Sequence, residues 1–282
     1  MRSLGLRREQ RTKMALIYLF LGVSLIFVLF PIVWMFLTSL KTYAETMRVP
    51  PTWIPQKLTF NAYIDMWVRK PFGIYFVNST IIASCTAILS TLLGGLAGYG
   101  FSRFIFKGKA LILGFFLTTQ MLPGGLLIGP YFRILSKVGL FNTRLGLIIA
   151  FITICLPFCT WMLKGFFDTV PQELDQAAMI DGCSRLGAFG RILLPVAKPG
   201  MVATIIFAFL LAWCDVLWAL CLTSTHSMST ITLGIMRCVG EHQVYWPMLM
   251  AGSIIAGMPA IILYLLLQKF LIAGLTAGAM KG

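Results

Sequence analysis

The chain has 282 residues, of which 59% are hydrophobic and 11% are charged, and its mean hydropathy is +0.88. A soluble domain carries roughly 25% charged residues, so this composition excludes an ordinary soluble enzyme or binding module and makes lipid part of the solvent. The net charge of +14 does not indicate a nucleic-acid binder, because the basic residues stand between long uncharged runs and not on one patch.

Six apolar runs are long enough to cross a bilayer. A helix needs about 20 residues to cross the hydrocarbon core, and backbone polar groups in lipid must be paired within a helix or a closed barrel. Barrel strands alternate apolar and polar residues, and these runs do not. The sequence therefore predicts an all-α integral membrane protein, a single transmembrane domain over 1–282, with spans at about 14–40, 73–102, 110–132, 145–163, 199–223 and 246–268.

The first run follows a basic start, as the core of a secretory signal peptide does. It is longer than the roughly 7–15 residues of such a core and no small-residue cleavage site follows, so we expect it to remain as a span. Six spans place both ends of the chain on one side. Of the 23 lysines and arginines, 14 fall on that side and 9 on the other, which predicts that both termini are cytoplasmic.

Two longer segments are then expected outside. The first, 42–70, contains three prolines, which predicts an irregular loop with a short helix near Asn61–Trp67. The second is 224–245.

The longest inside segment, 165–198, is typical of a helix–turn–helix. Gly182 fits the residue after a helix that needs a positive φ. A second helix is expected from about Ser184 to Leu194, ended by Pro195.

The first helix of this segment has its own start signals. Pro171 suits a first turn, where its missing N–H costs nothing, and Thr169 with Gln172 resembles a capping box. The small side chains of Ala177 and Ala178 leave one side flat enough to dock closely against another surface.

Residues 176–182, QAAMIDG, and 191–195, RILLP, resemble the EAA loop of permease subunits of ATP-binding-cassette importers. The matching positions are Ala177, Ala178, Gly182, Ile192, Leu194 and Pro195. Gln176 departs from the pattern, because the family usually has glutamate there. The resemblance implies that the loop between the fourth and fifth spans couples them to an ATPase through Gln176, Ala177, Ala178, Asp181, Gly182, Ile192 and Pro195.

The resemblance extends over nearly the whole chain and narrows to maltose-type carbohydrate importers. It is carried by FPIVWMFLTSLK, NSTIIASCTAILSTLLGGLAGYGFSRFIFKGK, AWCDVLWALCLT and QKFLIAGLTAGAMKG. It implies a permease in a bacterial or archaeal cytoplasmic (inner) membrane that takes a sugar or oligosaccharide from an external solute-binding protein and passes it inward by alternating access. It also implies a second, homologous but different permease and two ATPase subunits that bind ATP and Mg.

Other functions are weighed against this one. Polyamine, amino-acid and phosphate importers share the loop and stay open as alternatives, as does a non-transport membrane sensor. No nucleotide-binding P-loop is present, so ATP hydrolysis falls to a partner and we expect this chain to be no enzyme and to hold no cofactor or metal. Cys155 and Cys159 share a helix face but have no histidine or carboxylate beside them, which favours packing over a metal site.

Four residues are candidates for the solute pathway. Gln120 is followed by Pro123, which predicts a broken helix, and pathway lining and interhelical packing are equal alternatives. Asp215 is an acid inside the fifth run and binds sugar hydroxyls or a gate, or makes a structural hydrogen bond. Trp213 and Trp218 either stack on a sugar ring or anchor the helix at the membrane interface.

Overall fold

The computed structural model describes the backbone of residues 2–240 and 243–279 and the side chains of 13–240 and 243–268. By length and composition, four of the described helices can cross a membrane: Lys13–Ser39, Phe72–Arg103, Arg144–Asp168 and Trp246–Gln268. Two further helix pairs are bent, and the number of spans is six if each pair is one span. The prediction of an all-α membrane protein is confirmed.

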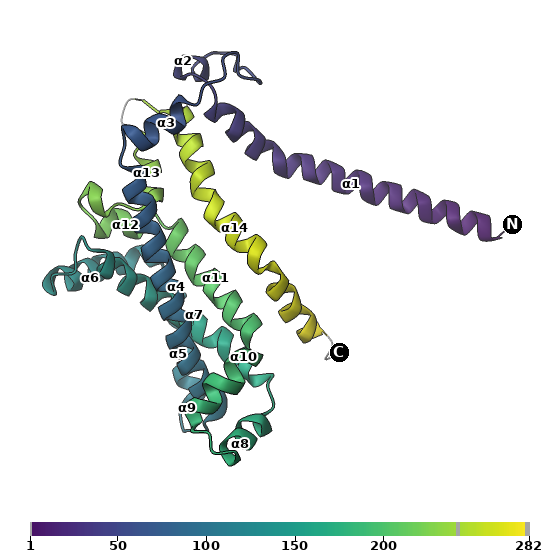
Figure 1. The fold of residues 1–282 in the computed structure, drawn as a ribbon, viewed down its shortest axis with the longest axis vertical. Coiled ribbons are helices and arrows are strands. Elements are labelled where there is room, and N and C mark those ends of the chain that lie inside the picture. Colours follow the sequence, from purple (N-terminus) through teal and green to yellow (C-terminus); the bar gives the residue numbers. More distant parts are fainter. Residues whose placement is uncertain (1, 241–242, 280–282) are drawn as a thin grey trace. The chain divides into compact units, whose positions relative to one another are not determined.

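The elements in chain order, labelled where space allows in Figure 1, are α1 (Arg2–Ser39), α2 (Tyr43–Thr46), α3 (Asn61–Val68), α4 (Phe72–Arg103), α5 (Lys109–Thr119), α6 (Gly124–Lys137), α7 (Arg144–Asp168), α8 (Gln172–Ile180), α9 (Arg185–Ala188), the π-helical turn η1 (Phe189–Leu193), α10 (Leu194–Val196), α11 (Lys198–Cys214), α12 (Leu217–Leu222), the 3-10 turn η2 (His226–Met228), α13 (Ile231–Met236) and α14 (Trp246–Ala279). The chain divides into two compact units, 1–70 with 238–255, and 71–237 with 256–282.

In the first unit, side-chain contacts join the loop after α1 and the short helix α3 to the end of α1. The hydroxyl oxygens of Ser39 and Tyr63 lie 2.8 Å apart, which ties the end of α1 to α3. Trp34 and Trp53 meet edge to face with ring centroids 5.3 Å apart. The short helix predicted near Asn61–Trp67 is confirmed as α3.

The second unit is built on α4, α7 and α11, which lie side by side (Figure 1). Helices α4 and α7 approach each other closely, because glycines of α4 face α7. A Cβ atom at Gly94 would lie 2.7 Å from Cβ of Cys159, and one at Gly98 would lie 3.0 Å from backbone atoms of α7. Cys155 and Cys159 are both fully buried in a hydrophobic cluster, as the packing interpretation predicted.

The third predicted span is broken, as the sequence indicated. Helix α5 ends at Thr119, α6 begins at Gly124, and the two axes meet at 95°. Pro123 has a ψ of 120°, which is outside the helical range, and it has no amide hydrogen to continue the helix.

Two boundaries differ from the prediction. The fifth span is not one helix over 199–223, because Asp215 has extended backbone (ψ 139°) and separates α11 from α12. Pro195 does not end the helix before it. Its missing N–H is tolerated in the first turn of α10, after the π-helical turn, and the chain then bends by 83° into α11.

Candidate functional site

Helix α8 is the element that the sequence analysis placed at the centre of the inside loop. It begins directly after Pro171, and no side chain caps its start. The predicted capping box is wrong, because the hydroxyl of Thr169 donates to the carbonyl of Phe166 at 2.7 Å and so closes α7. The turn after α8 agrees with the prediction: Gly182 has φ +88°, and the amide of Cys183 donates to the carbonyl of Ala178 at 2.9 Å.

The second arm of the loop, residues 184–197, packs against the ends of α4 and α7. Ser184 starts it, and its hydroxyl accepts the amide hydrogen of Gly187 at 3.1 Å. A hydrophobic cluster then joins the end of α4, the end of α7 and the second arm; its buried members are Tyr99, Leu163, Phe167, Val170, Phe189, Leu193 and Ala197. The loop is therefore a packed part of the second unit.

The two sides of α8 have different surroundings. Asp175 and Ala178 are buried at 4% and 6% exposure, and α8 packs against α9 and η1. Away from these contacts, Leu174 is 43% exposed, Ile180 is 87% exposed, and Ala177 and the charged Glu173 are exposed as well. We call Leu174, Ala177 and Ile180 the outer face of α8. Ala178 thus faces the protein's own core, which corrects the interpretation that both alanines form one external docking side.

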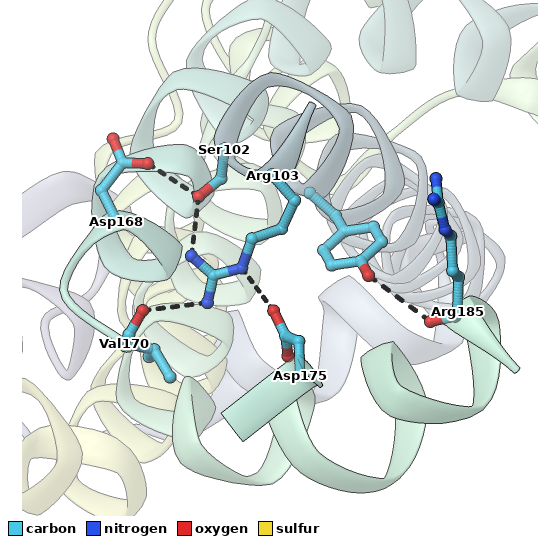
Figure 2. Close-up of polar contacts among 7 residues, drawn as sticks. Ser102, Arg103, Asp168, Val170, Asp175 and Arg185 are labelled. Atoms are coloured by element: carbon cyan, nitrogen blue, oxygen red, sulfur yellow. Dashed lines mark hydrogen bonds and ion pairs between the residues drawn. The ribbon is translucent and has the colours of Figure 1, made fainter. Parts of the chain in front are cut away.

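An arginine connects α8 to α4 (Figure 2). Nε of Arg103, at the end of α4, lies 2.5 Å from Oδ2 of Asp175, and the two side chains are 8% and 6% exposed. Nη2 of Arg103 also donates to the carbonyl of Val170 at 3.0 Å. Removing one partner of a buried ion pair costs about 3–5 kcal/mol, because the other charge stays buried without compensation.

A second set of contacts joins α4 to the end of α7 (Figure 2). The hydroxyl of Ser102 donates to Asp168 at 2.7 Å. Within α7 itself, Lys164 donates to the other carboxylate oxygen of Asp168 at 2.5 Å. The sequence analysis did not identify these residues, and it counted Arg103 and Lys164 only as basic flanks.

The other predicted coupling residues lie around α8. Gln176, Asp181 and Pro195 are exposed, and Ile192 is half-buried. Gln176 lines a pocket of about 280 Å³ together with Arg103, Asp175 and Arg185. Among the residues that the structure describes, no three His, Cys, Asp or Glu side chains lie close enough to hold a metal ion.

Of the four candidates for the solute pathway, Gln120 is exposed and Asp215 is half-buried, whereas the rings of Trp213 and Trp218 are buried at 2% and 5% exposure. Nε2 of Gln120 donates to the carbonyl of Ile154 in α7 at 2.7 Å, so it ties the α5 end to a neighbouring helix. Trp213 is 2% exposed, its indole N–H donates to the carbonyl of Ala256, and its ring stacks on Phe209. Its ring is therefore open neither to a solute nor to the membrane interface.

Asp215 and Trp218 stand at the break between α11 and α12. One carboxylate oxygen of Asp215 accepts the amide hydrogens of Trp218 and Ala219 at 2.9 and 3.2 Å, which satisfies the first turn of α12. The ring of Trp218 packs edge to face on Tyr131 of α6, with centroids 5.1 Å apart. The breaks in the third and fifth runs therefore meet, because α12 packs on α6.

The chain is similar in sequence to a known protein family and to several named proteins. The family described as "Binding-protein-dependent transport system inner membrane component" matches residues 90–277. The inner membrane ABC transporter permease protein YcjP of Escherichia coli is 37% identical over 94% of this chain and 95% of its own. The sulfoquinovosyl glycerol transport system permease protein SmoH of Agrobacterium fabrum is 36% identical over 93% of each chain.

Further similar proteins extend the comparison. The trehalose/maltose transport system permease protein MalG of Thermococcus litoralis is 35% identical over 98% of this chain and 99% of its own. A chain from a crystal structure of a bacterial ABC transporter involved in the import of the acidic polysaccharide alginate has the same fold, with a TM-score of 0.79 at 20% identity over 94% of this chain and 98% of that one.

Proposed function

The chain belongs to the family of binding-protein-dependent transport system inner membrane components, and we propose that it forms the membrane path of an importer for a sugar or oligosaccharide. The observation that carries this proposal is similarity over almost the full length to permeases named for sulfoquinovosyl glycerol and for trehalose and maltose. It is a multi-pass inner membrane protein, and the ATPase activity resides in partner subunits.

The working importer contains this chain, acting as one transmembrane permease domain, a second homologous but different permease, two ATP-binding-cassette subunits that bind ATP and Mg, and an external solute-binding protein. This chain holds no cofactor of its own. The family description supports the binding-protein part of this assembly, because transport in it depends on such a protein.

The outer face of α8 is the docking surface for the ATPase. Its exposed apolar side chains fit a protein cleft, and Gln176 and Asp181 lie exposed beside it. Gly182, Ile192 and Pro195 shape the loop, and Ala178 lets it pack closely on the permease. ATP-driven closure of the ATPases moves α8, and the spans then exchange between outward-facing and inward-facing states. No covalent chemistry falls to this chain.

Both termini lie in the cytoplasm, with α8 on the same side. The excess of lysine and arginine on that side supports this orientation. We expect alkaline phosphatase fused after Lys281 to be inactive in cells and a fluorescent protein fused there to be bright. An active phosphatase fusion would reverse the orientation.

The solute passes the two meeting breaks, where Gln120 and Asp215 lie, and the buried ring of Trp218 supports the path from behind by packing on Tyr131. Broken helices are tolerated in membranes where they line a cavity, which supports this path. We expect Asp215→Asn to keep the melting temperature of the purified protein, because asparagine still accepts the two amide hydrogens, and to lower solute uptake through the lost charge. Asp215→Ala should lower both, with a cap loss of about 1 kcal/mol. Unchanged uptake in the asparagine variant would leave Asp215 a structural role only.

Uptake by reconstituted importer tests the solute class. With its own binding protein in excess, we expect accumulation of at least one labelled di- or oligosaccharide, and no accumulation of amino acids, polyamines or phosphate. The matched control is the same complex with an ATPase that binds but does not hydrolyse ATP. Uptake confined to a non-sugar solute would refute the sugar proposal and keep the family.

A further inference from the structure

The buried pair of Arg103 and Asp175 connects α8 to a span that is not its neighbour in sequence (Figure 2). Helix α8 follows α7 after a link of three residues, 169–171, whereas Arg103 is the last residue of α4. The guanidinium also holds the carbonyl of Val170 inside that link. One side chain of α4 therefore fixes both α8 and the segment that leads into it.

The end of α7 is fastened at the same place. Ser102, next to Arg103, donates to Asp168, the last residue of α7, and Arg103 donates in turn to the hydroxyl of Ser102 at 3.4 Å. Because α4 and α7 are also closely packed through Gly94, the two spans respond together to a force applied at Arg103. Backbone continuity alone would pass movement of α8 to α7 through an irregular link.

One oxygen of the pair is left without a partner. Oδ1 of Asp175 is buried and accepts no hydrogen bond from the residues that the structure describes, while Nη2 of Arg103 donates to the carbonyl of Val170. Guanidinium and carboxylate form their strongest contact through two parallel hydrogen bonds. A two-bond arrangement of this pair would require Nη2 to move from Val170 to Oδ1, which a shift of α8 relative to its link would allow.

We infer that Arg103 and Asp175 are positioning residues for coupling: the pair passes movement of α8 to α4 and exchanges between one and two hydrogen bonds as the transporter changes state. This inference rests on the proposed docking of the ATPase on α8. Neither residue touches ATP or solute, and both act through the orientation of α8. The exchange requires a guanidinium, because Nε and Nη2 lie in one rigid plane that matches both carboxylate oxygens, whereas the three donors of an ammonium diverge from a single nitrogen.

The test uses the complete importer in vesicles, with ATP hydrolysis measured with and without solute-loaded binding protein. Arg103→Lys keeps the buried charge, so we expect the complex to assemble. We expect the ratio of stimulated to basal ATP hydrolysis to fall by roughly fivefold or more, which is the lower end of allosteric coupling effects. Uptake should fall in parallel. Arg69→Met, which removes an exposed arginine paired with Asp65 in α3, is the matched control and should change nothing.

Single neutral variants such as Asp175→Asn strand a buried charge and are expected to reduce assembly. The double variant Arg103→Met with Asp175→Leu removes both charges and restores an apolar contact, so assembly should return while coupling does not. If Arg103→Lys and the double variant both assembled and coupled as the wild type does, the pair would be structural only and the inference would fall. Loss of docking is distinguished from loss of coupling, because loss of docking removes the ATPase from the complex, whereas loss of coupling leaves it bound.

Discussion

Replacing Ile180 by aspartate is expected to detach the ATPase from the permease while the spans still fold. Ile180 is 87% exposed, so the chain itself does not need this side chain. In the complex it belongs to the apolar outer face of α8 with Leu174 and Ala177, and central apolar contacts dominate interface energies. A charge placed there is desolvated without a partner, which we expect to cost at least about 2 kcal/mol, or roughly 30-fold in affinity.

Co-purification of the complex with a tagged ATPase measures this loss, and size-exclusion chromatography of the permease in detergent checks its fold. Ile54→Asp is the matched control, because it makes the same change at a residue of similar exposure, 74%, in the first outside loop. Ala178→Asp gives a different failure: its carboxylate would be buried inside the permease, so the loop itself should unfold. Wild-type recovery of the ATPase with Ile180→Asp would show that the outer face is not the docking surface.

Replacing Gly94 by valine is expected to prevent formation of the folded protein. The new Cβ would lie 2.7 Å from Cβ of Cys159 and 3.1 Å from backbone atoms of α7, and backbone cannot move aside as a flexible side chain does. Ordinary overpacking costs about 1–3 kcal/mol, and we expect more here, because α4 and α7 must separate along their length.

Gly100→Val provides the control. Gly100 lies in the same helix, so the cost of a β-branched residue in a helix is the same, but among the described residues no atom beyond its neighbours and its own helix backbone lies within 4 Å of its added Cβ. The measurement is the yield of monodisperse protein after extraction in detergent, with the melting temperature of whatever is recovered. Equal yields for the two variants would mean that α4 and α7 do not approach as closely as described.

Hydropathy located four apolar helices that are long enough to cross a membrane, because lipid imposes a length on apolar runs. Pro123 identified a break, because proline cannot continue a helix. The break at Asp215 was not predicted, since an acid inside an apolar run has no fixed local conformation. The prediction for Pro195 was wrong, because a proline can either end a helix or stand in the first turn of the next one. Here the π-helical turn before it places Pro195 in the first turn of α10.

The candidate site was predicted in its local parts only. The positive φ of Gly182 was predictable, because the turn after a helix favours glycine. The sequence does not say which side of α8 faces the core, since small residues suit internal packing as well as docking, and Ala178 lies inside while Ala177 lies outside. The pair of Arg103 and Asp175 was missed because only the folded loop brings these residues together.

If the ATPase docks on the outer face of α8 as proposed, the choice of ATPase is separate from the fold of the permease, because different residues of α8 serve each. Asp175 and Ala178 hold the helix to its own chain, whereas Leu174, Ala177 and Ile180 are left to the partner. Substitutions on the outer face can therefore change which ATPase is accepted without disturbing the inner contacts. On this proposal, we expect that exchanging these three side chains, and not a whole loop or domain, shifts a permease toward the ATPase of another importer.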